Sequence, residues 1–91
     1  MSRYNKSVIN EDGNLRELNW GFDNVLGYYY DVTDPTIEEN HGVIEEWSSA
    51  QGYTQNHKGK DGKSRSTMLE FLIKYDLSEE QRSLVALDMP L

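Results

Sequence analysis

The aromatic stretch between positions 20 and 32 constrains the fold of this 91-residue chain more than any other segment. It contains one of the two tryptophans, one of the two phenylalanines and three of the six tyrosines. Burial of one aromatic side chain removes about 150–250 Å² from water. Any stable fold of the chain must therefore place this stretch in its core.

Apolar and polar residues alternate through this part of the chain, as they do in a strand with one buried face. The turn-forming pair Asp23-Asn24 divides the alternating pattern into two runs. We therefore predict an antiparallel hairpin near residues 15–33 as the centre of the sheet. Tyr29 is expected on the opposite face from the buried side chains. The predicted buried face consists of Leu18, Trp20, Phe22, Leu26, Tyr28, Tyr30 and Val32.

The C-terminal quarter predicts two helices, at about 66–76 and 78–88. Residues 68–75 are nearly all apolar, which indicates a helix buried on most sides. The second helix begins with a capping box, in which Ser78 and Gln81 stand three residues apart. Together with the hairpin, these helices predict an α+β fold with a small antiparallel sheet of about three strands.

The remaining segments are less regular. Residues 1–7 are polar and expected to be loosely held, and Asp12-Gly13 favours a tight turn. Residues 43–48 fit either a strand or a short helix, and their β-branched residues favour the strand. The glycine-rich stretch 51–65 is expected to be a flexible loop. A chain of this length makes one domain, residues 1–91.

Composition limits the function classes. The absence of cysteine excludes disulfides and thiol chemistry and favours a reducing cytoplasm. No window resembles a signal peptide or a membrane span. The formal charge of −7 disfavours direct binding to nucleic acids or anionic membranes. We therefore expect a cytoplasmic protein without membrane contact.

The acids are concentrated in one segment, because residues 31–46 contain six of them and no lysine or arginine. Such a run is most often a solvated acidic face. The sharper hypothesis is a docking surface for a protein with a basic surface, with exposed aromatic residues beside it. This candidate partner-binding surface consists of Tyr29, Asp31, Asp34, Glu38, Glu39, Glu45, Glu46 and Trp47.

The basic loop that follows is a candidate for weak anion contact through Lys58, Lys60, Lys63 and Arg65. Gly62-Lys63-Ser64 matches the end of a phosphate-binding loop, but His57 occupies the position where that motif needs glycine. The two histidines, 41 and 57, lack the spacing and the cysteines of a zinc site. No cofactor, metal or catalytic residue is predicted.

The leading hypothesis is a small acidic, non-enzymatic protein-protein interaction module. An alternative is a nucleic-acid mimic of the phage or plasmid type, whose spaced carboxylates would inhibit a DNA- or RNA-handling protein. A second alternative is a small enzyme or ligand-binding subunit, which would need a pocket with converging polar groups. The segment Trp20-Gly21-Phe22-Asp23 with the aromatic strand after it resembles segments of small bacterial proteins, a likeness that implies no activity.

Overall fold

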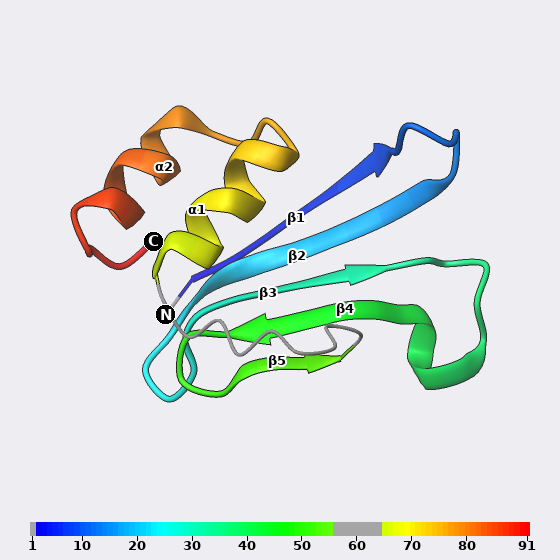
Figure 1. Ribbon diagram of the computed structural model, residues 1–91, viewed down its shortest axis with the longest axis horizontal. Coiled ribbons are helices and arrows are strands. Elements are labelled where there is room, and N and C mark those ends of the chain that lie inside the picture. The colour runs from blue at the N-terminus through cyan, green and yellow to red at the C-terminus, as the bar shows by residue number, and fades with distance from the viewer. Residues whose placement is uncertain (1, 56–64) are drawn as a thin grey trace.

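The computed structural model describes residues 2–55 and 65–91, which form one antiparallel sheet and two α-helices (Figure 1). Each strand pairs with its neighbour in the sequence, in the order β1-β2-β3-β4-β5. The fold is therefore α+β, as predicted. The elements are β1 (Ser2–Ile9), β2 (Leu15–Asp23), β3 (Gly27–Thr33), the 3-10 helix η1 (Glu39–Gly42), β4 (Val43–Ser48), β5 (Gly52–Gln55), α1 (Arg65–Lys74) and α2 (Glu79–Ala86).

The described sheet has five strands rather than about three. Strand β1 begins at Ser2, where the sequence predicted loosely held chain up to residue 7, and all eight of its residues pair with β2. The polar composition of β1 gives no strand signal in the sequence, because an edge strand buries little of either face. Strand β5 lies within the predicted 51–65 loop, and residues 56–64 fall outside the described residues. The strand prediction for residues 43–48 is confirmed.

The central hairpin forms as predicted, from β2 and β3. Trp20 lies opposite Tyr30, and Phe22 lies opposite Tyr28. The turn is closed by the carboxylate of Asp23, which accepts hydrogen bonds from the amides of Val25 at 2.7 Å and Leu26 at 3.2 Å. Asp23 thus fixes the register that brings the aromatic pairs together.

The core lies between the sheet and the two helices. Trp20, Tyr28 and Tyr30 are only 5%, 5% and 3% exposed, as the sequence predicted. Phe71 of α1 stacks on Tyr30 with ring centroids 4.1 Å apart and planes within 10°. Trp47 of β4 also stacks on Tyr30, with ring centroids 5.4 Å apart. Contacts of this kind contribute beyond simple area burial, by about 0.5–1.5 kcal/mol each.

The second helix is anchored to the sheet by a buried polar contact. Ser78 caps α2 by accepting a hydrogen bond from the amide of Gln81 at 3.3 Å, which confirms half of the predicted capping box. The Gln81 side chain does not turn back to the cap. Its Oε1 instead accepts the indole N–H of Trp20 at 2.9 Å, because a buried indole donor needs a partner.

The other face of the sheet carries polar side chains and Tyr29. The Tyr29 hydroxyl donates to the carbonyl of Ser2 at 3.1 Å, so its ring reaches across Gly21 of the intervening strand. A Cβ atom on Gly21 would lie 2.2 Å from that same carbonyl oxygen and 3.0 Å from the tyrosine hydroxyl. Glycine at this position therefore permits the close approach that ties β1 to β3.

The two helices are too short to cover the whole sheet. The ten residues of α1 span about 15 Å, whereas the nine residues of β2 span about 30 Å. Figure 1 shows both helices over the end of the sheet near the β2–β3 turn. The end near the β1–β2 turn carries no α-helix among the described residues, and a large depression lies there.

Candidate functional site

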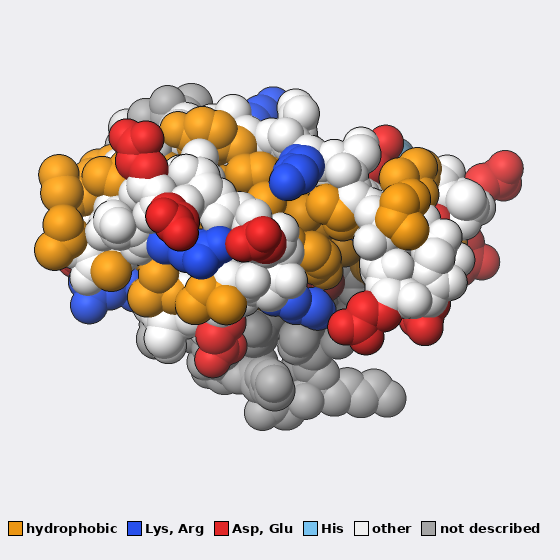
Figure 2. Space-filling model, turned by 90° about the horizontal axis from the view of Figure 1, so that it is seen from above, with side chains coloured by type: hydrophobic (Ala, Val, Ile, Leu, Met, Phe, Trp, Pro, Cys, Tyr) orange, Lys and Arg blue, Asp and Glu red, His pale blue; other side chains and the backbone are white. Residues whose placement is uncertain are grey.

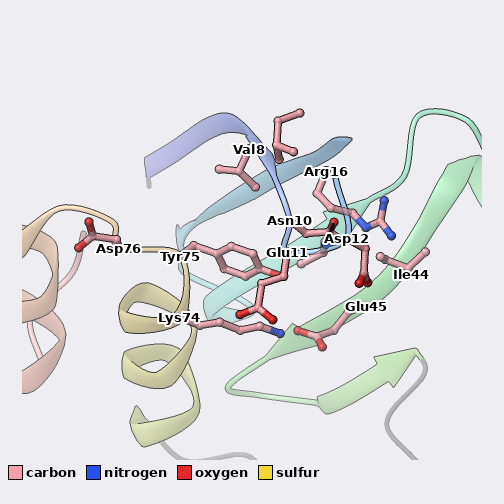
Figure 3. A pocket seen from close by; sticks show the side chains of 12 residues that line it. Val8, Asn10, Glu11, Asp12, Arg16, Ile44, Glu45, Lys74, Tyr75 and Asp76 are labelled. Atoms are coloured by element: carbon pink, nitrogen blue, oxygen red, sulfur yellow. Dashed lines mark hydrogen bonds between the residues drawn. The ribbon is translucent and has the colours of Figure 1, made fainter. Parts of the chain in front are cut away.

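A half-open groove with a cavity volume of about 660 Å³ lies at the uncovered end of the sheet (Figure 3). Sites that bind small molecules or side chains commonly have volumes of about 300–1,000 Å³. Its walls come from the β1–β2 hairpin, from β3 and β4, and from the end of α1. The lining residues are Val8, Ile9, Asn10, Glu11, Asp12, Arg16, Val32, Ile44, Glu45, Lys74, Tyr75 and Asp76.

The floor of the groove is aliphatic and continuous with the core. Val32 is fully part of the core, and Val8, Ile44 and Tyr75 pack against it while remaining partly exposed. Ile44 reaches the groove because the register between β3 and β4 shifts between Val32 and Thr33. A shift of this kind redirects a side chain that regular alternation would place on the other face.

The rim of the groove is charged, with four acids and two bases among the lining residues. Glu11 and Asp12 extend over the groove from the β1–β2 turn, and Lys74 extends from α1 on the other side (Figure 3). Asp76 is engaged by Arg82, with 2.9 Å between their charged atoms. The rim therefore has an acidic balance above an apolar floor.

Arg16 forms one end of the groove and is held by Asp34. Nη1 of Arg16 lies 3.1 Å from Oδ2 of Asp34, and only 16% and 13% of the two side chains are exposed. The pKa of Asp34 is lowered, first by hydrogen bonds from the hydroxyl and amide of Thr36 and then by the Arg16 guanidinium. Asp34 is thus held in place by Arg16 and Thr36.

On the opposite face of the sheet, Asp31 is a half-buried carboxylate. It accepts a hydrogen bond from the side-chain amide of Asn19 at 3.0 Å, and Glu46 lies opposite it on β4. Burial raises the pKa of Asp31, and the charge of Glu46 acts in the same direction, while hydrogen bonds from Asn19 and Thr33 oppose the rise. Like charges opposite each other across strands destabilise the ionised state.

The structure does not bring the predicted partner-binding surface together. Asp31 and Glu46 lie on the open face, whereas Glu45 lines the groove on the other side. Glu38 and Glu39 are exposed near η1. Tyr29 is half-buried and donates a hydrogen bond to the carbonyl of Ser2, and Asp34 forms an ion pair with Arg16.

Trp47 requires a correction. We expected it on the surface beside the acids, but it is only 1% exposed and stacks on Tyr30 in the core. Its register opposite Tyr30 places it on the helix-covered face, so it is not available to a partner.

Of the predicted anion-contact loop, Lys58, Lys60 and Lys63 lie outside the described residues. Arg65 is the first residue of α1 and lies 3.9 Å from Asp88. Within residues 2–55 and 65–91, no three side chains group as metal ligands. In the same part of the chain, no helix has the length and apolar character needed to cross a membrane.

The groove was missed by the sequence reasoning. In the sequence, Asp12-Gly13 predicts a tight turn, and no local pattern marks Val8, Ile9 or Glu11 as lining a groove. Their meeting with Ile44 and Tyr75 depends on pairings between residues far apart in the chain. A local signal did exist in Arg16, a base that period-two alternation places on the same side of the strand as Leu18 and Trp20.

Seen from the helix side, the charged side chains are interspersed with hydrophobic ones (Figure 2). The fold is thus a small α+β antiparallel meander whose groove, at about 660 Å³, is larger than a second depression of about 320 Å³ beside Ser2 and Tyr29. Comparison with protein-family models, with curated proteins and with solved structures yields no match.

Proposed function

We propose that this protein is an interaction module that binds a basic segment of another protein, with an aliphatic side chain of that segment inserted in the groove. The observation that carries the proposal is the combination of an apolar floor, formed around Val8, Ile44 and Tyr75, with an acidic rim. A buried apolar anchor surrounded by polar contacts is the usual anatomy of a protein-binding site.

The charge of the groove favours a basic occupant. Glu11 and Asp12 are exposed at the rim, and the chain as a whole carries −7. An acidic field of this kind speeds the approach of a basic segment and disfavours acidic ones. The groove is half-open to solvent, so an extended peptide has access without a movement of the sheet.

The nucleic-acid mimic is less well supported by the geometry. A mimic needs carboxylates along one surface, whereas Glu45 and Glu46 lie on opposite faces of the sheet and Asp34 is paired with Arg16. An acid-base enzyme would need a carboxylate shielded from water, and Glu11 and Asp12 are exposed. The interaction module is the function that the groove supports best.

The test is an NMR titration with two short peptides, acetyl-Lys-Arg-Gly-Leu and acetyl-Glu-Asp-Gly-Leu, both with free carboxyl ends. We expect the basic peptide to shift the amide signals of Val8, Ile44 and Tyr75, and its affinity to fall as salt increases. The acidic peptide should bind more weakly. Absence of groove shifts with the basic peptide, or equal binding of both peptides, would contradict the proposal.

A matched pair of variants tests the rim. Glu11→Gln with Asp12→Asn should weaken binding of the basic peptide by about 3- to 10-fold, as expected for two exposed charge pairs. Glu17→Gln with Glu70→Gln makes the same change in net charge at two exposed residues that do not line the groove. This control should leave the affinity nearly unchanged at moderate salt.

A further inference from the structure

Arg16, at the end of the groove, has N–H groups that make no hydrogen bond within the described part of the protein. Both of its protein contacts use Nη1, which donates to the carbonyl of Leu15 at 2.9 Å and to Asp34 at 3.1 Å. A guanidinium has five N–H groups. The remaining ones, on Nε and Nη2, have no acceptor among the described residues, although the side chain is only 16% exposed.

The guanidinium is also fixed in place. Asp34, its partner, is itself oriented by the hydroxyl and amide of Thr36, at 2.6 and 2.9 Å. The edge of Arg16 that carries Nε and Nη2 is therefore presented in one orientation. A preorganised edge of this kind matches the two oxygens of a carboxylate, which it binds through two parallel hydrogen bonds.

We infer that the groove receives the C-terminal residue of the partner protein. Its terminal carboxylate pairs with the Nε and Nη2 edge of Arg16, and its aliphatic side chain lies on the floor formed by Val8 and Ile44. Basic residues just before the terminus face Glu11 and Asp12. This inference rests on the proposed function, because it specifies the segment that the groove binds.

The juxtaposition in the groove favours a chain terminus over other anions. Within a protein chain, only the C-terminal residue can carry a carboxylate and an aliphatic side chain on the same carbon atom, and the groove places a guanidinium beside an aliphatic floor. A phosphate would bring more negative charge to a site lined by four acids and two bases. Capture of a C-terminal carboxylate is a recurring mode of peptide recognition.

The experiment compares acetyl-Lys-Arg-Gly-Leu with its C-terminal amide, which keeps every other group. We expect the amide to bind about 10-fold more weakly, the loss typical of one charge-assisted contact. Equal binding of acid and amide would overturn the C-terminal inference and leave the proposed function standing. Failure of both peptides to bind would overturn the two together.

Variants of Arg16 assign the effect to this residue. Arg16→Lys keeps a positive charge beside Asp34 but loses the forked edge, so the acid should lose its preference over the amide. The matched control is Arg3→Lys, which makes the same change at an exposed arginine that does not line the groove. An unchanged acid preference in Arg16→Lys would exclude Arg16 as the carboxylate partner. If that variant does not fold, the acid and amide comparison on the unaltered protein still decides the inference.

Discussion

The two ends of the helix-facing side of the sheet differ although they share the same strands. Near the β2–β3 turn, Trp20, Tyr30 and Trp47 are sealed under α1 and α2. Near the β1–β2 turn, Val8 and Ile44 remain partly exposed and line the groove. The difference arises because the helices are about half as long as the strands. Side chains of similar character thus become part of the core or of the groove floor according to what covers them.

The largest effect on stability is expected from a substitution at the helix-covered end of the sheet. Trp47→Ala should lower the free energy of unfolding by about 3–5 kcal/mol, because it leaves a cavity beside Tyr30 in a tightly packed cluster. Urea denaturation followed by circular dichroism measures the change. A loss below about 1 kcal/mol would mean that Trp47 is not buried in solution and would restore it as a candidate surface residue.

The second largest loss of stability is expected from removing the hydrogen bond that anchors α2 to the sheet. Gln81→Ala removes the acceptor of the Trp20 indole and should cost about 1–3 kcal/mol, the usual penalty for a buried donor left without a partner. Hydrogen exchange of the α2 amides should accelerate in the variant. Ser83→Ala, an exposed position on the same helix, serves as the control and should change the stability little.

Truncation in the uncovered end should cost less stability. Val8→Ala removes two methyl groups from a partly exposed side chain and should lower the free energy of unfolding by about 1 kcal/mol. Its affinity for the basic peptide should fall as well, since Val8 forms part of the floor. A stability loss as large as that of Trp47→Ala would show that the groove is closed in solution and that the two ends do not differ.

The smallest expected effect on stability is at Asp31 on the open face of the sheet, where a substitution should stabilise the fold rather than destabilise it. The pKa of Asp31 is raised in the folded protein, so its ionised form is disfavoured there and stability falls as the pH rises through that pKa. Asp31→Asn should therefore raise the free energy of unfolding at pH 7, by about 0.5 kcal/mol, the scale of one cross-strand pair. Denaturation series at several pH values test this.

The gain from Asp31→Asn should shrink as the pH falls through the raised pKa and should vanish below the ordinary aspartate pKa, where the wild-type carboxyl is protonated in both states. Asp34 provides the contrast, because its pKa is lowered and its contribution is lost as the pH falls. A gain from Asp31→Asn that grew in acid would contradict the assigned direction of the Asp31 pKa.

Much of the fold was predictable because its signals are local. The alternation around Trp20 and Tyr30 predicted the hairpin, and Ser78 predicted the start of α2. Strand β1 was missed because its polar residues show no buried face, and it is stabilised mainly by pairing with β2. The predicted acidic surface failed as a unit because neighbours in a strand, such as Glu45 and Glu46, face opposite sides.

The sequence alone determined that this chain builds an aromatic hairpin, buries it under C-terminal helices and keeps a negative charge outside. Those outcomes follow from side-chain chemistry and short-range periodicity. The tertiary structure alone decided where the groove lies, because it depends on the length of α1 relative to the strands and on a register shift at Ile44. It also decided that Arg16 presents a free edge there, since its neighbour Asp34 is 18 residues away in the chain.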